Sequence, residues 1–304
     1  MRLLDDAALQ AVYDRDVRSY LFTRLRVRRA SQPRLIIVGG QPGCGKSGAV
    51  LVASHELRAA SAGAGAAVIN GDELRARHPH YKRLVQEDRA TAADKTGADV
   101  GAWVERGIRD AAAGGFNTVI ETTMRQPAVV LATAQVFKDA GHQVELRVLI
   151  VDPEISQLAI YQRFAGALTT RSALPRFTLP RYHEEALAKM PQTLQDVTNN
   201  GAGPVAIVRL VNRAGDELHS SQGTHADLAE VFGLYRRAQL SPAQVQRIDA
   251  DWRALRATLD RAGVPELVRE GVRNQQERFS GLAKSDPTPA VLRDTLPRAR
   301  EPER

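Results

Sequence analysis

An apolar run that leads into a glycine-rich loop constrains the fold of this chain more than any other stretch. Residues 35–39 read Leu-Ile-Ile-Val-Gly, and Gly40–Ser47 fits G-x-x-x-x-G-K-[ST] at every fixed position. Residues 48–60 have the composition of a helix. Glycines let successive backbone N–H groups turn inward around an anion, and the N-terminus of the following helix adds unpaired N–H donors. The order strand, loop, helix therefore predicts a phosphate-binding loop rather than a chance glycine-rich turn.

The side chains of this loop have separate expected roles. We expect Lys46 to reach the β- and γ-phosphates of a nucleotide, and the Ser47 hydroxyl to ligate Mg²⁺. The other residues expected to surround the phosphates are Gly40, Gln41, Pro42, Gly43, Cys44 and Gly45. Cys44 is the one cysteine of the chain, so no internal disulfide can form, which is typical of a reducing compartment. A small side chain in a tight loop is the favoured role for Cys44, and a redox switch is the alternative.

The length and net charge of the chain limit the classes of protein to which it can belong. The chain has 304 residues, of which 43% are hydrophobic, enough for one large α/β domain and an appendage. A formal net charge of +7 permits acidic ligands, nucleotides included. The arginines are scattered and no basic block is interleaved with aromatics, so nucleic acid is not the expected partner. No apolar run approaches the ~18 residues of a membrane span, and the start lacks a secretory signal. We therefore expect a cytoplasmic protein.

Alternating strand and helix patterns predict an α/β fold with a parallel sheet. The expected strands are residues 35–40, 67–70, 116–123, 144–151 and 205–211. The expected helices are 46–62, 86–113, 127–140, 154–170 and 182–198, after one or two amphipathic helices in 3–28. The predicted fold is a P-loop kinase whose five-stranded, mainly parallel sheet is flanked by helices, and we expect this domain to occupy residues 1–223.

The character of the chain changes from residue 224 onward. Ser241, Pro242 and Gln244 form a capped helix start, and an apolar stripe at helical spacing follows it. A second helix is expected near 265–284. Residues 224–284 are thus predicted to be a helical extension, and we favour docking on the kinase over a partner-binding element. Residues 285–304 are rich in proline and charge and are predicted to be disordered.

Polar residues follow two of the predicted strands and should meet at one edge of the sheet. Asp72 lies just past the second strand, and Glu121, Thr123 and Arg125 lie at the exit of the third. Ligands of open α/β sheets bind at the carboxyl ends of the strands. Asp72 is accordingly a candidate general base, with a helix N-cap as the alternative. For Glu121 the alternative is a solvated acid at a strand end.

Arginines after the fourth strand resemble those of a kinase lid. Arg163 lies in the expected helix 154–170, and a proline-punctuated basic segment follows it, with Arg176 and Arg181. Arginines in such a helix, loop, helix arrangement can stabilise the charge of a phosphoryl group in transfer. Ordinary surface arginines are the alternative for each.

These motifs occur in one order: the phosphate loop, Asn70-Gly71-Asp72, His78-Pro79, Glu121-x-Thr123, and the lid arginines. Together they resemble the zeta toxin family, P-loop kinases of bacterial toxin–antitoxin systems, over roughly residues 35–215. The resemblance implies ATP- or GTP-dependent phosphorylation of the sugar 3′-hydroxyl of UDP-N-acetylglucosamine or a related UDP-amino sugar. It also implies a small helical antitoxin as partner.

The resemblance also implies roles for matching positions. Asp72 would accept the hydroxyl proton, while Lys46, Arg163 and Arg176 would stabilise the phosphoryl group. The residues that would hold the sugar nucleotide are Glu121, Thr123 and Arg125. Two departures concern the substrate: Thr122 stands where the family has glycine, and the residues from 224 onward have no counterpart in the minimal family kinase. Three arginines compete for one lid role, namely Arg171, Arg176 and Arg181.

Two other functions stay open at this point. The first is a P-loop kinase of another small molecule, such as an antibiotic, a nucleotide or an NAD-type cofactor. The second is a nucleotide-dependent switch or a nucleic-acid-binding ATPase, which the positive charge would suit. The third strand ends in Glu121 and lacks the Asp-centred apolar pattern usual in such motors, so the sequence favours a kinase over this last class.

Overall fold

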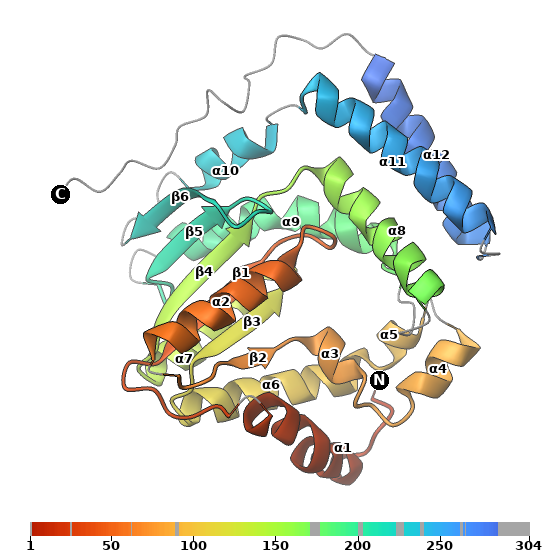
Figure 1. The fold of residues 1–304 in the computed structure, drawn as a ribbon. Coiled ribbons are helices and arrows are strands. Elements are labelled where there is room, and N and C mark those ends of the chain that lie inside the picture. The colour runs from red at the N-terminus through yellow and green to blue at the C-terminus, as the bar shows by residue number, and fades with distance from the viewer. Residues whose placement is uncertain are drawn as a thin grey trace.

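A six-stranded sheet forms the centre of the computed structural model (Figure 1). The structure describes residues 2–24, 26–61, 63–88, 91–170, 177–199, 203–222, 228–237, 240–261, 264 and 266–284. The strand order is β2-β3-β1-β4-β5-β6. The strands are β1 (Arg34–Gly39), β2 (Ala67–Ile69), β3 (Thr118–Thr122), β4 (Gln143–Leu149), β5 (Ile207–Val211) and β6 (Glu217–Gln222). β1 to β5 run parallel, so their carboxyl ends gather at one edge.

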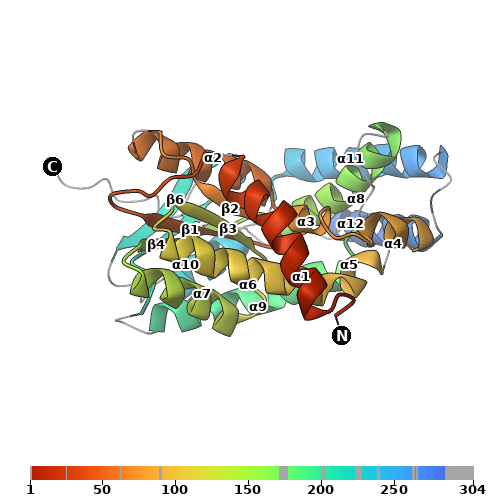
Figure 2. The same ribbon diagram turned by 90° about the horizontal axis from the view of Figure 1, so that it is seen from below.

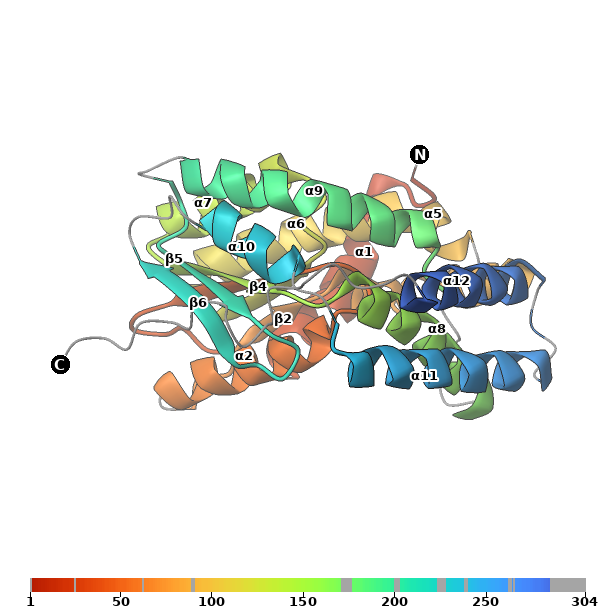
Figure 3. The same cartoon turned by 90° about the horizontal axis from the view of Figure 1, so that it is seen from above.

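Helices cover both faces of the sheet, as the edge-on views in Figures 2 and 3 show. One face carries α2 (Lys46–Ala60), and the other carries α6 (Gly97–Ala113), α7 (Pro127–Asp139) and α9 (Pro180–Asn199). The α2 side has a compact apolar core that includes Ile36, Val38 and Leu57. A larger core lies on the opposite side and includes Ile37 and Trp103. Alternate residues of β1 therefore feed two different cores, as expected for a buried parallel strand.

The predicted α/β fold is confirmed, but the count of five strands is wrong. β6 pairs antiparallel with β5 and extends the sheet at that edge. Its sequence, ELHSSQ, is almost wholly polar, so hydrophobic periodicity does not reveal it. Its hydrogen-bonded partner strand alone identifies it, and Gly215, at φ 96°, sits in the turn between the two strands. A polar edge strand also discourages pairing with a second sheet.

Two predicted helical stretches are more broken than expected. The N-terminal segment begins as α1 (Asp6–Val12) and continues through π-helical turns at Tyr13–Val17 and Ser19–Thr23. The stretch predicted at 86–113 is divided among α4 (Tyr81–Glu87), α5 (Ala92–Lys95) and α6. A short helix, α3 (Gly71–Arg75), follows β2 directly. This division leaves α3 and α5 at the carboxyl edge, beside the phosphate loop.

The C-terminal half adds α8 (Pro153–Thr170), α10 (Leu228–Arg237), α11 (Pro242–Arg261) and α12 (Glu266–Lys284). α10 lies beyond the predicted boundary at residue 223, yet Leu228 and Phe232 belong to the larger sheet core. α11 starts with the expected reciprocal cap, in which Gln244 N donates to Ser241 Oγ at 3.3 Å. The tail predicted at 285–304 lies outside the described residues. Among the described residues, no helix combines the length and apolar character that crossing a membrane requires.

Candidate functional site

The phosphate loop joins β1 to α2 and adopts a backbone that its glycines make accessible. Gly40, Gly43 and Gly45 have φ angles of 155°, 80° and 99°, where residues with a Cβ are strained. Sterics add to this at Gly43, since a Cβ there would lie 1.9 Å from the backbone oxygen of Ser156 in α8. The loop is therefore packed tightly against α8, and its first helical residue is Lys46.

Lys46 is buried and already engaged with the loop. Its side chain is 6% exposed, and Nζ donates to the carbonyl oxygens of Gly40 at 2.8 Å and Gln41 at 3.0 Å. Glu121 Oε1, at the end of β3, lies 3.9 Å from the same ammonium. The loop carbonyls thus hold the ammonium over the loop, where a bound phosphate would lie.

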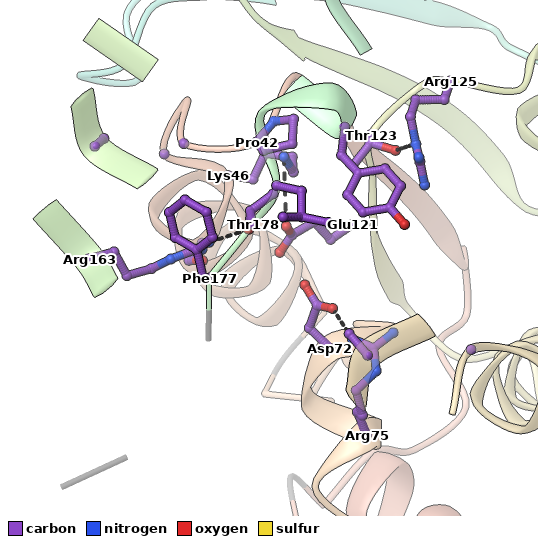
Figure 4. A pocket seen from close by; sticks show the side chains of 18 of the residues that line it. Pro42, Lys46, Asp72, Arg75, Glu121, Thr123, Arg125, Arg163, Phe177 and Thr178 are labelled. Atoms are coloured by element: carbon purple, nitrogen blue, oxygen red, sulfur yellow. Dashed lines mark hydrogen bonds and ion pairs between the residues drawn. The ribbon is translucent and has the colours of Figure 1, made fainter. Parts of the chain in front are cut away.

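A cavity of about 570 Å³ opens at the carboxyl edge of the sheet (Figure 4). Its lining brings together residues from seven separate segments. They include Pro42, Gly43, Gly45, Lys46, Ser47, Asp72, Arg75, Glu121, Thr123, Arg125, Arg163, Thr178, Tyr182 and Arg213. Asp72 and Lys46, 26 positions apart in sequence, therefore share one cavity. The predicted convergence of strand-end side chains is seen at this edge.

Asp72 lies in the first turn of α3, and Asn70 is the N-cap of that helix. Asn70 Oδ1 accepts a hydrogen bond from the backbone N of Asp72 at 2.9 Å, so the alternative that Asp72 caps the helix is wrong. With Asn70 as the cap, the Asp72 carboxylate faces the cavity. It accepts from Arg75 NH1 at 2.5 Å, and Arg75 lines the same cavity. This ion pair fixes the direction of one carboxylate oxygen.

The end of β3 is held in place by side chains on both sides. Asn70 Nδ2 donates to Glu121 Oε2 at 2.8 Å, which ties the strand end to the start of α3. Arg125 Nε donates to Thr123 Oγ1 at 3.1 Å, and its NH1 pairs with Glu185 of α9 at 2.9 Å. Glu121 is thus not a freely solvated acid: it lies between Asn70 and Lys46, with its side chain 16% exposed.

The threonine that departs from the family pattern does not line the cavity. Thr122 Oγ1 accepts from the backbone N of Met124 at 3.2 Å. Met124 has a φ of 55°, which a bulky residue adopts only when its surroundings impose it. Thr193 fixes the other side of this turn by donating to Met124 O at 2.7 Å. The added side chain therefore supports the turn that presents Thr123 and Arg125.

The predicted lid arginines have different positions. Arg163 on α8 lines the cavity, and its NH2 donates to Thr178 Oγ1 at 3.1 Å. Arg181 instead approaches Asp94 at 3.3 Å, with its side chain 65% exposed. Arg171 and Arg176 lie outside the described residues, so the assignment of Arg176 stays a prediction. Of the arginines with described positions, Arg163 is the one suited to a lid role.

Sequence reasoning missed two arginines of the cavity, Arg75 and Arg213. Arg213 follows the carboxyl end of β5, and its side chain lies against Gly45 of the phosphate loop. A strand-end position was the signal available for Arg213, because the carboxyl ends of parallel strands share one edge. Arg75 had a weaker signal, its place one helical turn after Asp72.

Cys44 is fully buried beneath the loop, and burial raises the pKa of its thiol. A buried thiol held in its neutral form is a poor nucleophile, so a packing role is favoured over a redox switch. Cys44 also limits the space at Gly40, where a Cβ would lie 2.6 Å from Sγ.

Comparisons with known proteins show the family of this chain. The zeta toxin family model matches residues 18–224. "Toxin PezT" of Streptococcus pneumoniae is 29% identical over 157 residues, which is 52% of this chain and 60% of that protein. "Toxin zeta" of Enterococcus hirae is 26% identical over 197 residues, 65% of this chain and 66% of that protein. The chain thus spans less than two thirds of the length of either relative.

Solved structures show the same fold. A chain from the PezAT chromosomal toxin–antitoxin system of S. pneumoniae superposes with a TM-score of 0.70 at 22% identity, covering 85% of this chain and 99% of that one. The family model ends at residue 224, whereas 85% of the 304 residues is more than 224 residues. The superposition therefore extends beyond the family segment into the C-terminal part of the chain. A chain of the AvrRxo1-ORF1:ORF2 complex with ATP has a TM-score of 0.51 at 14% identity, covering 89% of this chain and 84% of that one. With more than half of its residues matched by the family model, this chain belongs to the zeta toxin family.

Proposed function

We propose that this protein is a small-molecule kinase that uses ATP or GTP and Mg²⁺ to phosphorylate the sugar 3′-hydroxyl of UDP-N-acetylglucosamine or a related UDP-amino sugar. One observation carries the proposal: a phosphate-loop lysine, Lys46, and a strand-end carboxylate, Asp72, line the same cavity. A P-loop kinase needs a cation over the transferred phosphate and an acceptor for the hydroxyl proton, within reach of one another.

The phosphate end of the cavity suits a nucleoside triphosphate. The loop's backbone N–H groups and the N-terminus of α2 would hold the β-phosphate, with Lys46 reaching toward the γ-phosphate. Mg²⁺ in kinases is bound through few protein groups together with phosphate oxygens and water. The donor set fits this mode, since Ser47 lines the cavity and the described residues contain no cluster of three or more His, Cys, Asp or Glu side chains. Bound to Ser47 and the phosphates, Mg²⁺ would neutralise charge on the β,γ-bridge.

Transfer requires one proton to move and one P–O bond to be exchanged. The 3′-oxygen attacks the γ-phosphorus, the bond from phosphorus to the β,γ-bridging oxygen breaks, and Asp72 accepts the hydroxyl proton. The Asp72 carboxylate lines the cavity, and its ion pair with Arg75 holds it there. Arg163, from the facing helix α8, would stabilise charge on the phosphoryl group, and we assign Arg176 the same role.

The acceptor end of the cavity is polar. Glu121, Thr123 and Arg125 supply a carboxylate, a hydroxyl and a guanidinium within one strand exit. A carboxylate and a hydroxyl suit sugar hydroxyl and amide groups, while a guanidinium suits a diphosphate. Tyr182, whose ring lies 5.1 Å from the Arg125 guanidinium, adds an aromatic surface to the same wall. These groups support a sugar nucleotide as acceptor.

The proposal is tested by incubating the purified protein with Mg²⁺, ATP and UDP-N-acetylglucosamine and measuring the mass of the sugar nucleotide. A gain of one phosphate is expected with the wild type, and Asp72→Asn is expected to lower turnover by on the order of 10². Glu73→Gln, a change at the adjacent acid, is the matched control, because Glu73 bonds Tyr20 and does not line the cavity. A panel with nucleosides, NAD and aminoglycosides runs in parallel. If only another compound gained phosphate, the proposed acceptor would be wrong and the assignment as a kinase would stand.

We propose in addition that the protein acts as the toxin of a toxin–antitoxin pair, with a small helical antitoxin as partner. Support comes from the names of the relatives and from the PezAT system to which the superposed chain belongs. Induced expression in a bacterium should arrest growth with the wild type and not with Lys46→Ala. Equal growth of both strains at equal protein levels would contradict the toxin role.

A further inference from the structure

The two C-terminal helices, α11 and α12, pack on α8, the helix that carries Arg163 (Figure 1). They form an apolar core that is separate from both cores of the sheet. Its buried members are Leu158, Tyr161, Phe164, Ala165, Ile248, Trp252, Leu255, Leu259, Val264, Val268, Val272 and Phe279. We call these two helices the C-terminal hairpin. The hairpin thus shares its core with the candidate lid helix rather than with the sheet.

α8 contacts the phosphate loop along its first turns. The backbone oxygen of Ser156 lies so close to Gly43 that a Cβ there would be 1.9 Å away, and Ile160 Cγ1 would be 3.0 Å away. Gln41 Nε2 donates to Val151 O at 2.8 Å and to Ser156 Oγ at 3.3 Å. The first turns of α8 are therefore packed directly against the phosphate loop.

Aromatic side chains connect the hairpin to the wall of the cavity. The Tyr161 ring lies 5.5 Å from Trp252 of α11 and 5.1 Å from Phe177, and Phe177 lies 5.4 Å from Phe164. Phe177 and Thr178 line the cavity, and Thr178 accepts the hydrogen bond of Arg163. A continuous set of contacts thus runs from Trp252 through Tyr161 and Phe177 to the partner of Arg163.

A polar contact also connects the N-terminal turn of α8 to the hairpin. Arg278 on α12 approaches Glu154 Oε1 at 2.5 Å and Gln157 Oε1 at 3.3 Å. The Glu154 side chain is 12% exposed, whereas that of Arg278 is 50% exposed, so the pair lies at the edge of the contact between the two helices. Apolar and ionic contacts therefore hold α8 over its length, from Glu154 to Ala165.

We propose that the C-terminal hairpin is a positioning element of the active kinase: it holds α8 and Phe177 so that Arg163 faces the cavity. Tyr161, Trp252 and Phe177 are the positioning residues. The inference rests on the proposed function only for what Arg163 does there. A helix fixed on two sides keeps its side chains in place for a charge that appears only during transfer, and misplacement by about 1 Å can cost on the order of 10² in rate.

A single glycine offers a direct test. α12 packs closely on α8 at Gly271, where a Cβ would lie 2.5 Å from the Tyr161 hydroxyl oxygen but 3.4 Å from Cζ, an ordinary contact. That hydroxyl is buried and has no hydrogen-bond partner among the described residues. Gly271→Ala should therefore push α12 and α8 apart, and adding Tyr161→Phe should restore the fit. Gly281→Ala is the matched control in the same helix, since a Cβ built there has no atom of the described residues within 4 Å apart from its chain neighbours and the local helix backbone.

The first measurement is hydrogen exchange in the full-length protein. Gly271→Ala should increase exchange of the amides of residues 153–168 relative to wild type, Gly281→Ala should not, and the pair Gly271→Ala/Tyr161→Phe should return to the wild-type pattern. This reading does not depend on which acceptor the kinase uses. Unchanged exchange in α8 for Gly271→Ala would overturn the proposal even if the wild type proves to be a UDP-sugar kinase.

The second measurement is turnover, measured by phosphate transfer to the acceptor or by phosphate release from ATP. Gly271→Ala should lower kcat about tenfold, with the dissociation constant of an ATP analogue changed by less than about threefold. In an Arg163→Ala background the same change should have almost no further effect, because the hairpin acts through Arg163. If the losses of kcat from Gly271→Ala and Arg163→Ala were additive, the hairpin would act as a stabilising scaffold and not through Arg163. If Gly271→Ala raised kcat, the hairpin would restrain the enzyme. Either result overturns the proposal.

Discussion

The side chain of Arg213 lies against Gly45 of the phosphate loop: a Cβ at position 45 would be 3.3 Å from Arg213 Cγ and 3.5 Å from Nε. Arg213 comes from the turn between β5 and β6, which Asn212 shapes by accepting hydrogen bonds from the backbone N atoms of Ala214 and Asp216 at 2.9 and 3.0 Å. The turn thus brings a second cation to the loop beside Lys46, on the side opposite the acceptor residues of β3.

Arg213→Ala is therefore expected to weaken nucleotide binding. A guanidinium beside the phosphates contributes on the order of 1.5 kcal/mol through charge-assisted hydrogen bonds, so the KM for ATP should rise about tenfold. The KM for the acceptor should change little. Steady-state kinetics with each substrate varied in turn gives both values, and Arg83→Ala is the control because the Arg83 side chain is exposed, pairs with Glu87 and does not line the cavity. An increase confined to the KM for the acceptor would mean that Arg213 binds the acceptor and not the nucleotide.

Gly43→Ala should destabilise the protein far more than Gly63→Ala. Both glycines have a φ of 80°, so an alanine at either position meets the same backbone strain of about 1–2 kcal/mol. A Cβ at Gly43 would also collide with the backbone of Ser156, whereas a Cβ at Gly63 would have no described atom within 4 Å apart from its chain neighbours. Thermal unfolding and ATP-analogue binding of the two variants separate strain from collision. Equal losses of stability in the two variants would mean that α8 can move away from the added methyl group at position 43 without a loss of stability.

Glu145→Gln should cost about 3 kcal/mol of the free energy of unfolding, because it unpairs buried charge. The Glu145 side chain is 1% exposed and lies 2.6 Å from Arg147, 3.1 Å from Arg34 and 3.3 Å from Arg209, on three neighbouring strands. Urea unfolding of this variant is compared with that of Glu87→Gln, an exposed acid paired at 2.7 Å, where less than about 1 kcal/mol is expected. Similar losses of unfolding free energy in Glu145→Gln and Glu87→Gln would show that water hydrates the arginines around position 145 once the carboxylate is removed.

His142 should make the protein less stable as the pH falls below about 6.5. Burial lowers the pKa of this imidazole, although its hydrogen bond to the backbone carbonyl of Phe116 opposes the shift. Its Nε2–H donates to Phe116 O at 3.1 Å, and Nδ1 has no partner among the described residues. The unfolded chain therefore binds the proton more readily than the folded one. The stability due to neutral His142 is present above its unfolded pKa and is lost as the pH falls through the folded pKa.

Thermal unfolding between pH 7.5 and 5 measures this dependence. His142→Gln keeps a donor for Phe116 O and should flatten the loss of Tm on the acid side. His55→Gln, at an exposed position of α2, should retain the wild-type dependence. If His142→Gln and the wild type lost Tm in parallel, the acid sensitivity would belong to other groups.

Much of the candidate site could be predicted because local rules govern its parts. The phosphate loop is a continuous motif with fixed glycine positions, and strand-end placement sufficed for Asp72, Glu121, Thr123 and Arg125. What could not be predicted depended on pairing and packing. Polar β6 has no periodicity of its own, and Asn70 rather than Asp72 is the N-cap of α3. Arg181, one of the three arginines that competed for the lid role, pairs with Asp94 and does not line the cavity.

The sequence by itself determined the phosphate loop and the α/β class, because each is encoded in short segments whose backbone preferences and apolar spacing are local. The order of its motifs carried the resemblance to the family. Only the tertiary structure decided that Arg213 and Arg75 belong to the cavity, and that the C-terminal hairpin packs on the helix of Arg163. The physical reason is that such contacts join segments distant in sequence: their apolar faces show that a residue is buried, but not which partner buries it.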